Sequence, residues 1–526
     1  MEDALTLTKR TLALLTVAVL ALGLGTPASA EPETEMPQQW RSYWVDAFNE
    51  GIYTPAQVTR LVQDAKKINA NALIVQVGRR YDCFCNRALY PRTDAAIAPL
   101  PYDPLDEVIT QGHAAGLEVH AWVNINTMWN AATPHSSPEH VFNKHGRSAT
   151  GSDRWLNKRY DGQELIGANA FMDPANPGAV NYIVSGIQSI VREYEVDGIN
   201  LDYVRYPDHS STTTHSDWGY SETSLARFQA ATGRTDIPLP SDPQFSDWRR
   251  TQMTNLVRKI YLGMWEVDPQ ARLSMDGITY SFGPQTMGGW ENTRPYAEVL
   301  QDWKGWMAEG IMDTVVAMNY KRNWMPDQKQ MYDEWTEVLA DWQGERQAVI
   351  GPALYLNDIP DSVEQVRLAL APTAAGNTAA GWSGYSYANP TRAGVNQPLS
   401  VRNAERDKLA QALTTGPDAP FANKVAVPVM PWKATPTEGH ISGRVTLRTG
   451  TPLDQVRVTL RPLSTGGERI TRLADGDGWF GFVHLRPGVY QVQVDLPNGV
   501  VGQPIAVAEV RAGAVSKVDL TNLMQR

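Results

Sequence analysis

One segment of the chain places acidic, basic and aromatic side chains together at the end of an apolar run. Residues 196–207 read VDGINLDYVRYP, so Asp202 ends a β-compatible run and is followed by Tyr203, Arg205 and a proline. A buried parallel strand that ends in such side chains is typical of a barrel strand ending in an active site. With Arg205 beside it, we expect Asp202 to have a low pKa and to act as an ionised nucleophile or oxocarbenium stabiliser. The competing interpretation is an ion pair that only ties a loop to the barrel rim.

Cleavage of a glycosidic bond requires a second, protonated carboxyl group across the bond. Asp276 follows apolar Met275 near the end of another predicted strand, where a raised pKa would keep it protonated. The dipeptide Asp276-Gly277 is also typical of a turn, so both interpretations stay open. The alternatives for the acid are three other carboxyl groups: Asp46, Asp82 and Glu222, the last of which looks like the first turn of a helix.

The elements that must position these groups alternate between apolar runs and amphipathic helices. Helix 54–68 opens with Thr54 as N-cap and Pro55 in its first turn, and helix 104–115 stops at Gly116. The expected strands are 43–48, 72–77, 118–123, 198–204, 273–278, 314–318, 348–354 and 380–385. This alternation of eight strands with helices predicts an α/β fold, a TIM (β/α)8 barrel. A doubly wound sheet is the alternative, but the sequence contains no glycine-rich phosphate loop. Residues 208–247 are expected to form a long loop on the catalytic face.

Side chains at the C-terminal strand ends of a barrel face its active site, and here they are acids, amides and aromatics. A lone histidine such as His120 is more often structural than functional, but it shares a strand face with Trp122 and Asn124, so we expect a sugar contact. Trp122 and Tyr320 are expected either to stack on sugar rings or to cap the core. The predicted substrate-binding residues are Asp46, Gln76, Arg79, Asp82, His120, Trp122, Asn124, Tyr203, Arg205, Asn319, Tyr320, Tyr355 and Tyr385.

The composition excludes several other classes of chemistry. Histidines are too scarce at the strand ends for a metal-dependent hydrolase, and no Gly-x-Ser-x-Gly elbow occurs, so we expect neither a metal nor any other cofactor. The formal net charge of -10 argues against nucleic acid or an anionic membrane as the main partner. The 17 Trp and 20 Tyr exceed the 10 Phe, which suits sugar recognition, although a large core also uses such rings. Cys83 and Cys85 are expected to pack in a loop or to form a tight local bridge, without a catalytic role.

The two ends of the chain differ from the barrel in their pattern of apolar and polar residues. Residues 1–30 resemble a secretory signal, with Lys9 and Arg10 before an apolar run at 12–24 and Ala28-Ser29-Ala30 as cleavage site. An uncleaved anchor is the alternative, but the run is short for a membrane span. We therefore expect a secreted or envelope-associated protein with no membrane insertion after cleavage. The predicted divisions are a signal at 1–30, a short linker at 31–39, a barrel at 40–415, a linker at 416–438 and a small domain at 439–526.

The C-terminal segment alternates in the manner of an antiparallel β-sandwich. The runs at 441–448, 456–460 and 490–494 are separated by Gly and Asp turns. The stretches DGDGWFGF at 475–482 and LRPGVY at 485–490 resemble the carboxypeptidase-regulatory, or prealbumin-like, fold. Asp475 and Asp477 are the right type of residue for a calcium loop, but a hairpin turn explains them better.

Several motifs in order resemble the glycosyl hydrolase-like 10 family of bacterial secreted proteins. They are RSYWVD at 41–46, NALIVQV at 71–77, YDPL at 102–105, HAAGLEVHAWVN at 113–124, DGINLDYVRYP at 197–207 and AMNY at 317–320. The resemblance covers about 40–387 and implies a TIM-barrel glycosidase that acts on bacterial glycans, such as peptidoglycan strands without stem peptides. Asp202 matches the family's Asp-Tyr-x-Arg-Tyr-Pro signature. Tyr81 and Cys83 depart from its Arg-x-x-Gly-Asp-Ala form, which puts substrate contacts near Asp82 in doubt.

A second comparison concerns the mechanism. The same segment is similar to the family 18 chitinase signature Asp-Gly-x-Asp-x-Asp-x-Glu, but Asn200 replaces the middle Asp and Val204 replaces the catalytic Glu. Substrate-assisted hydrolysis needs that acid, so a chitinase mechanism is disfavoured.

The leading hypothesis is therefore a secreted glycoside hydrolase with a carboxylate pair, acting with retention on an amino-sugar polymer of the bacterial cell envelope. The alternative is a non-catalytic barrel that binds cell-wall glycan, with a structural envelope protein as a weaker third possibility. A second carboxyl group within reach of Asp202 favours the enzyme, and its absence favours the binding protein.

Overall fold

Eight parallel strands close into a barrel in this computed structural model, which describes residues 37–463 and 467–526. The predicted signal, and the linker residues before position 37, lie outside the described residues. The strands are β1 (Trp40–Val45), β2 (Ala72–Gly78), β3 (Glu118–Asn124), β7 (Gly198–Asp202), β8 (Arg272–Ile278), β9 (Thr314–Met318), β10 (Gln347–Gly351) and β11 (Gly381–Tyr385). The barrel closes where β1 pairs with β11, and a Cβ on Gly381 would lie 2.1 Å from the Trp40 carbonyl oxygen. The predicted (β/α)8 barrel is confirmed.

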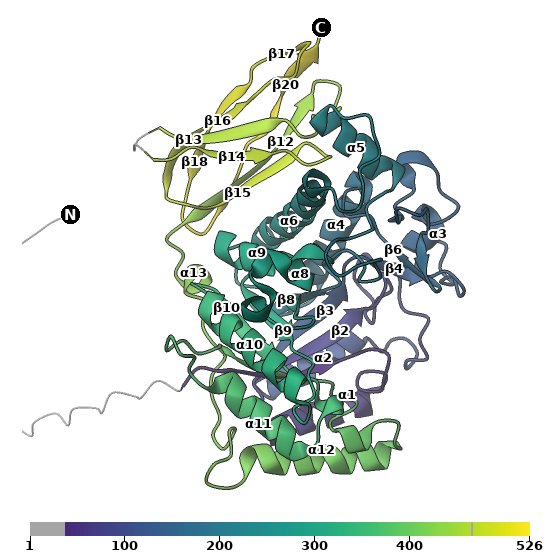
Figure 1. Ribbon diagram of the computed structural model, residues 1–526, viewed down its shortest axis with the longest axis vertical. Helices are drawn as coiled ribbons and strands as arrows, with labels where there is room; N and C mark the ends of the chain where they lie inside the picture. The colour runs from purple at the N-terminus through teal and green to yellow at the C-terminus, as the bar shows by residue number, and fades with distance from the viewer. Residues whose placement is uncertain (1–36, 464–466) are drawn as a thin grey trace, which may run out of the picture. The chain divides into compact units, whose positions relative to one another are not determined.

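Helices surround the strands and return the chain to the same end of the barrel each time (Figure 1). Thr54 caps α1 by accepting from the Gln57 N–H, and Gly116, at φ +75°, follows the end of α2, as predicted. The main helices are α1 (Pro55–Lys67), α2 (Pro104–Ala114), α4 (Pro177–Glu193), α6 (Pro243–Trp265), α9 (Trp303–Glu309), α10 (Pro326–Trp342), α11 (Ile359–Leu370) and α12 (Leu399–Thr414).

Insertions extend the loops that follow the strands. The connection after β3 carries α3 (Val141–His145) and a small sheet of β4 (Thr127–Asn130), β5 (Leu165–Ile166) and β6 (Asn169–Phe171). The segment 208–247, expected as a loop, contains α5 (Glu222–Thr232) and the start of α6, because Ser221 supplies an N-cap to the Ser224 N–H. The remaining short elements are η1 (Gly151–Asp153), α7 (Pro284–Met287), η2 (Trp290–Asn292), α8 (Arg294–Ala297), η3 (Leu354–Leu356), η4 (Arg392–Gly394) and α13 (Pro431–Ala434).

The barrel interior is a packed core rather than a channel. Trp40, Ile74, Val316 and Val349 are all fully buried inside it and contact one another as one cluster. A second, larger cluster lies between the outer faces of the strands and the helices. Side chains therefore fill the barrel below the level of the strand ends, so that only its two mouths are left open for ligands.

The C-terminal segment forms a separate β-sandwich with its own core. One sheet has the order β15-β12-β20-β17, with β19 also paired to β12, and the other has the order β14-β13-β16-β18. The strands are β12 (Gly439–Leu447), β13 (Arg457–Pro462), β14 (Ile470–Leu473), β15 (Trp479–Leu485), β16 (Gly488–Val494), β17 (Val500–Gly502), β18 (Ile505–Val510), β19 (Val515–Lys517) and β20 (Leu520–Gln525). Pairing is antiparallel except between β12 and its neighbours β19 and β20. The predicted small sandwich is confirmed.

The Asp475–Asp477 turn contacts the barrel helix α6. Asp475 Oδ1 accepts the backbone N–H groups of Asp477 and Trp479, both at 2.9 Å, which is how the turn is formed. The Lys259 ammonium donates to Asp475 Oδ2 at 2.9 Å and to Asp477 Oδ2 at 3.3 Å. A lysine therefore occupies the place that a cation would take in a calcium loop.

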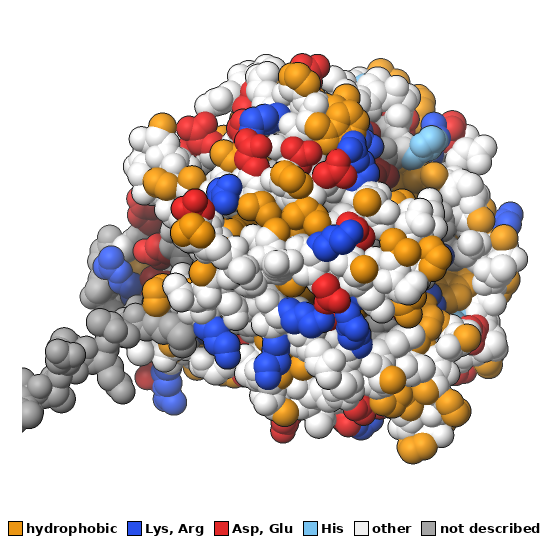
Figure 2. Space-filling model, turned by 90° about the horizontal axis from the view of Figure 1, so that it is seen from below, with side chains coloured by type: hydrophobic (Ala, Val, Ile, Leu, Met, Phe, Trp, Pro, Cys, Tyr) orange, Lys and Arg blue, Asp and Glu red, His pale blue; other side chains and the backbone are white. Residues whose placement is uncertain are grey.

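Four further features concern the linker, the two cysteines, the helices and the surface. The segment 416–438 packs on the barrel, since buried Lys433 pairs with Asp313 at 2.8 Å. Cys83 and Cys85 form a disulfide, the local bridge that was one of the two expectations. Within the described ranges, no helix combines the length and apolarity that a membrane span requires. On the face shown in Figure 2, acidic and basic side chains are interspersed with apolar ones rather than gathered into a field of one sign.

Candidate active site

The C-terminal ends of the barrel strands enclose a cavity of about 400 Å³, and most of the predicted site residues line it. The predicted residues in its wall are Asp46, Gln76, Trp122, Asn124, Asp202, Tyr203, Arg205, Asp276, Tyr320, Tyr355 and Tyr385. The wall also contains residues that the sequence did not single out: Phe48, Asp208, Ile278, Tyr280, Met318 and Lys321.

Two carboxyl groups on neighbouring strands form the floor of this cavity. Asp202 is the last residue of β7, and Asp276 lies in the adjacent parallel strand β8. The register pairs Leu201 with Met275, so the two acids are the next residues on their strands, and both face the cavity. Neighbouring strands lie about 4.8 Å apart. Asp202 is 5% exposed and Asp276 is 2% exposed, so both carboxyl groups are almost completely removed from water.

The environment separates the two acids in their affinity for a proton. Burial raises the pKa of Asp276 well above its ordinary value, and the charge of Asp202 raises it further. The pKa of Asp202 is also raised, because burial outweighs the ion pair between its Oδ1 and Arg205 Nη1 at 3.1 Å. The expectation of a low pKa for Asp202 is therefore wrong in direction. The arrangement still favours a proton on Asp276, since Arg205 bonds directly only to Asp202.

A buried polar relay holds Asp276 in place. Asn200 Nδ2 donates to Asp276 Oδ1 at 2.8 Å, and Asn200 Oδ1 accepts from Ser274 Oγ at 2.9 Å. In the sequence Asn200 stood out only as a departure from the chitinase signature. The structure shows that it orients the second carboxyl group instead.

Tyr203, directly after β7, has a backbone conformation that non-glycine residues rarely adopt. Its φ is +51°, in the left-handed region, and the Arg205 guanidinium lies 4.0 Å from its ring centroid. Its backbone N–H donates to Asp202 Oδ1 at 2.6 Å. Strained backbone of this kind is found at functional sites when the surrounding structure holds it in place. Here it turns the chain so that Asp202 and Arg205 reach the same cavity.

Amide and acid groups from β1 to β3 line one side of the cavity. Asn124 Oδ1 accepts from Gln76 Nε2 at 3.1 Å and from Trp122 Nε1 at 2.9 Å. Gln76 in turn accepts the Ala47 N–H at 3.0 Å. Burial raises the pKa of Asp46, which is the one alternative acid that lines the cavity. These fixed donors and acceptors are suited to the hydroxyl groups of a polyol.

Aromatic rings at the ends of β9 and β11 and after β10 line another part of the wall. Tyr320 and Tyr385 stack with centroids 5.1 Å apart, and Tyr355 meets Tyr385 edge-on at 6.0 Å. Tyr280 Oη donates to Asp208 at 2.7 Å and closes the rim. Flat rings with polar edges fit the apolar faces of sugar rings. Among residues 37–463 and 467–526, no group of three or more His, Cys, Asp or Glu side chains has the arrangement of a metal site.

Four predicted binding residues do not line the cavity. His120 is fully buried two residues into β3, where its ring lies 4.8 Å from that of Trp40 and its Nε2 is 3.0 Å from Glu118 Oε2. Asn319 is fully buried and donates to the Tyr332 carbonyl. His120 faces the packed barrel interior, because a strand pattern indicates the face of a side chain but not its depth in the barrel. Asn319 follows β9 and points outward to helix α10, where it also lies 3.2 Å from Thr336 Oγ1.

The loop after β2 accounts for the other two. Arg79 pairs with Asp82 at 2.8 Å, and Thr93 Oγ1 donates to the same carboxylate at 2.6 Å. Asp82 is fully buried, so this network fixes the loop. Glu222, the remaining alternative acid, is the first residue of α5 and also lies outside the cavity.

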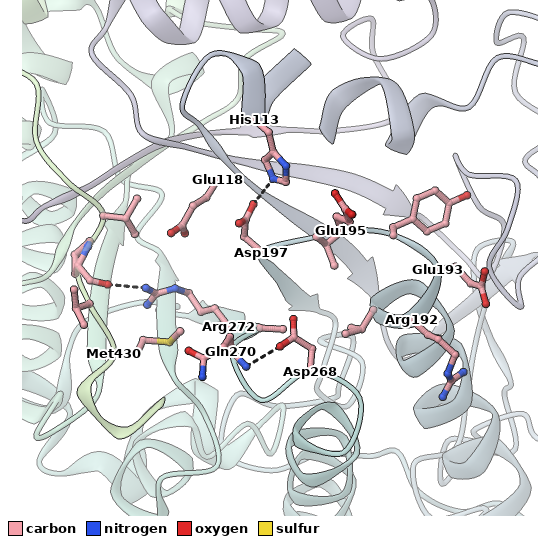
Figure 3. A pocket seen from close by; sticks show the side chains of 17 residues that line it. His113, Glu118, Arg192, Glu193, Glu195, Asp197, Asp268, Gln270, Arg272 and Met430 are labelled. Atoms are coloured by element: carbon pink, nitrogen blue, oxygen red, sulfur yellow. Dashed lines mark hydrogen bonds and ion pairs between the residues drawn. The ribbon is translucent and has the colours of Figure 1, made fainter. Parts of the chain in front are cut away.

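A larger hollow of about 790 Å³ lies at the other end of the barrel (Figure 3). His113 points toward Asp197, with Nε2 2.9 Å from Oδ2, and Asp197 also accepts the Val119 N–H at 2.7 Å. Arg272 donates to the Pro428 carbonyl at 2.8 Å. These charged groups connect the first residues of barrel strands to neighbouring segments. The N-terminal end of a barrel serves stability rather than catalysis. We therefore place the candidate site at the smaller cavity.

The chain is similar to several known proteins. Glycosyl hydrolase YngK of Bacillus subtilis (strain 168) is 25% identical over 303 residues, which are 54% of this chain and 51% of that protein. Glycosyl hydrolase DigH of Escherichia coli (strain K12) is 22% identical over 362 residues, 61% of this chain and 72% of that protein. The solved glycoside hydrolase domain of PgaB (BpsB) from Bordetella bronchiseptica shares 15% identity at a TM-score of 0.49, over 71% of this chain and 99% of that one. The chain thus spans about half the length of YngK.

The family resemblance is also confirmed over a long stretch. The sequence profile of the glycosyl hydrolase-like 10 family matches residues 39–361, from the first barrel strand into α11. The match includes Asp202, Arg205 and Asp276 on the cavity floor. With this match over more than half of its length, the chain belongs to the glycosyl hydrolase-like 10 family.

Proposed function

We propose that the protein hydrolyses O-glycosidic bonds in a polysaccharide, with Asp276 as the general acid and Asp202 as the ionised partner. The observation that carries the proposal is the buried, interacting carboxyl pair on β7 and β8 at the floor of a cavity with a tyrosine wall. Binding a neutral sugar does not require two such groups, whose burial costs stability. A second carboxyl group beside Asp202 therefore favours the hydrolase over a non-catalytic glycan-binding barrel.

In the proposed mechanism a sugar ring stacks on the tyrosines while the Asp276 O–H transfers its proton to the glycosidic oxygen. The bond from that oxygen to the anomeric carbon breaks, and the Asp202 carboxylate attacks the carbon to form a glycosyl ester. A water molecule then gives a proton to the Asp276 carboxylate and its oxygen to the anomeric carbon, which releases Asp202. Adjacent strands about 4.8 Å apart support retention, because retaining enzymes hold their carboxyl groups about 5–5.5 Å apart.

For the substrate we propose a bacterial cell-envelope polysaccharide of amino sugars, such as peptide-free peptidoglycan strands, reached after export by the predicted signal. Family membership supports the glycan class. Exposed aromatic rings at the rim of the cavity and outside it support a polymer: Phe48 in the wall is 54% exposed, and Trp324 outside the cavity is 49% exposed. Trp324 Nε1 donates to the Leu356 carbonyl at 3.1 Å, which places it beside the turn that carries Tyr355. Such rings lengthen the surface on which a glycan can stack.

The test is the release of soluble saccharides from peptide-free peptidoglycan strands by the wild type, Asp202→Asn and Asp276→Asn. We expect each variant to lose about 10²–10⁴-fold in rate, in line with loss of an acid–base group. Glu222→Gln is the matched control, because this carboxyl group lies outside the cavity, and it should retain full activity. Proton NMR of the first product gives the anomeric outcome, for which we expect retention.

Two results would count against the proposal. Equal release by the wild type and Asp202→Asn would remove this group from the chemistry. Tight retention of the strands without release of saccharides would favour the glycan-binding protein instead.

A further inference from the structure

The cavity wall contains a buried cation that the proposed mechanism does not use. Lys321 follows Tyr320 in the loop after β9, lines the cavity and is 6% exposed. Its ammonium donates to the Thr279 carbonyl at 2.7 Å and reaches Thr279 Oγ1 at 3.5 Å. In the part of the chain that the structure describes, no carboxylate oxygen lies within 4.0 Å of it.

The other buried lysines of the described residues differ from Lys321 in this respect. Lys259 contacts Asp475 at 2.9 Å, and Lys433 contacts Asp313 at 2.8 Å. Arg205, the other cation of the cavity, pairs with Asp202. Buried charges in proteins are normally paired, because an uncompensated charge in a low-dielectric site is costly. Among the buried lysines of the described residues Lys321 is the exception, and it lies where a ligand would bind. Within the same ranges buried Arg249 and Arg272 also lack a carboxylate partner, but they donate to backbone carbonyls away from the cavity.

The surrounding structure holds Lys321 firmly in this position. Its backbone carbonyl accepts from Asn357 Nδ2 at 2.9 Å and from Gln365 Nε2 at 3.1 Å, and both amides are fully buried. Burial lowers the pKa of Lys321 to about 7. Holding an amine at this fixed place on the wall therefore lowers the stability of the protein. An apolar side chain would fill the same space at no electrostatic cost.

We propose that Lys321 binds a carboxylate carried by a sugar of the substrate, which makes the substrate an acidic glycan. The inference rests on the proposed function in one respect, that the cavity binds a glycan. An entering carboxylate would supply the missing counter-charge and form a charge-assisted hydrogen bond in a site with little water. A neutral glycan would supply no counter-charge to this amine, so the residue determines specificity for acidic over neutral sugars.

The experiment compares two probes that differ only in this group. The first is peptide-free peptidoglycan strands, whose muramic acid residues carry a lactyl carboxylate, and the second is the same strands with that carboxyl reduced to an alcohol. Binding by affinity electrophoresis and kcat/KM by reducing-end release are measured for the wild type, Lys321→Gln and Lys321→Met. Lys321→Gln removes the charge and keeps an N–H donor on a shorter side chain, Lys321→Met removes both, and thermal unfolding verifies that both variants fold. Lys66→Gln, an exposed lysine at the end of α1, is the control.

We expect the wild type to prefer the carboxylated strands by about 30-fold, which corresponds to about 2 kcal/mol for a hydrogen bond between charged groups. Both Lys321 variants should lose this preference and handle the reduced strands as the wild type does. Equal treatment of the two probes by the wild type, or a preserved preference in the variants, would overturn the proposal.

The same data separate the two proposals. Selective binding without cleavage supports the carboxylate site and contradicts the hydrolase. Cleavage without selectivity contradicts the carboxylate site alone. Failure to bind or cleave either probe overturns both.

Discussion

Replacing Arg205 by methionine should destabilise the protein by an amount that depends on pH. Arg205 Nη1 lies 3.1 Å from Asp202 Oδ1, and both side chains are buried. Breaking a buried ion pair by removing one partner costs about 3–5 kcal/mol. The guanidinium also lies 4.0 Å from the Tyr203 ring, a cation–π contact that contributes about 1–2 kcal/mol when desolvated. We therefore expect a loss of about 3–5 kcal/mol in the free energy of unfolding at pH 8, most of it from the unpaired Asp202.

The loss should be smaller at low pH, because Asp202 can then take up a proton. Arg205 lowers the pKa of Asp202, so its removal raises that pKa further above the unfolded value. A carboxyl group whose folded pKa is raised contributes stability that is complete below its unfolded pKa and is lost as pH rises through its folded pKa. The loss caused by Arg205→Met should therefore be smaller at pH 5 than at pH 8.

Urea unfolding followed by tryptophan fluorescence at pH 5 and pH 8 measures both quantities. In the Asp202→Asn background no charge is left unpaired, so Arg205→Met should cost only about 1–2 kcal/mol. Arg511→Met, on the exposed edge of the sandwich, serves as the control and should have no such pH dependence. An equal loss at both pH values and in both backgrounds would show that Arg205 stabilises the fold by packing rather than by its charge.

Three further predictions concern other contacts. Asn200→Ala removes a hydrogen bond that lowers the pKa of Asp276. The alkaline limb of the pH profile of kcat/KM should therefore move to higher pH. An unmoved limb would show that Asn200 does not act on the acid. Lys259→Met breaks the pairs with Asp475 and Asp477 and should lower the free energy of unfolding by about 3 kcal/mol. The turnover of the folded protein should stay the same. A loss of turnover would link the sandwich to the chemistry. Trp324→Ala should raise KM for long oligosaccharides by about 10-fold and leave short ones unaffected, and an equal change for both would place Trp324 inside the reacting subsite.

Much of the barrel could be predicted because its elements have strong local patterns. β9 spans Thr314–Met318, the same residues as the apolar run in the sequence. The first strand was expected at 43–48 but spans Trp40–Val45, because Arg41 is buried and donates to the Asn423 carbonyl. The fourth was expected to extend to 204 and ends at Asp202, where Tyr203 turns into the left-handed region. The first boundary involves a contact with a distant residue, and the second depends on a backbone conformation that the apolar pattern does not reveal.

The site was predictable to the extent that its residues lie at strand ends. All strands of a parallel barrel end on one face, so counting from each run found Gln76, Asn124, Asp202 and Asp276. Lys321, like Tyr280 and Asp208, was missed because it lies in a loop beyond a strand, where packing against other loops sets the direction of the side chain. Periodicity alone gives the face of a strand and not its depth, which is why His120 was assigned to the cavity and lies in the core.

The sequence by itself determined the family, the alternation of strands and helices and the presence of Asp202 and Asp276 at one end of the barrel, because each depends on residues close together in the chain. Only the tertiary structure decided how strongly the two carboxyl groups are buried and which lysine of the cavity wall lacks a carboxylate partner among the described residues. Those properties depend on burial and on distances between β7, β8 and the loop after β9, which come together only when the barrel closes. Desolvation is a property of the whole packed site, and it outweighed the pairing of Asp202 with Arg205 from which the sequence argument started.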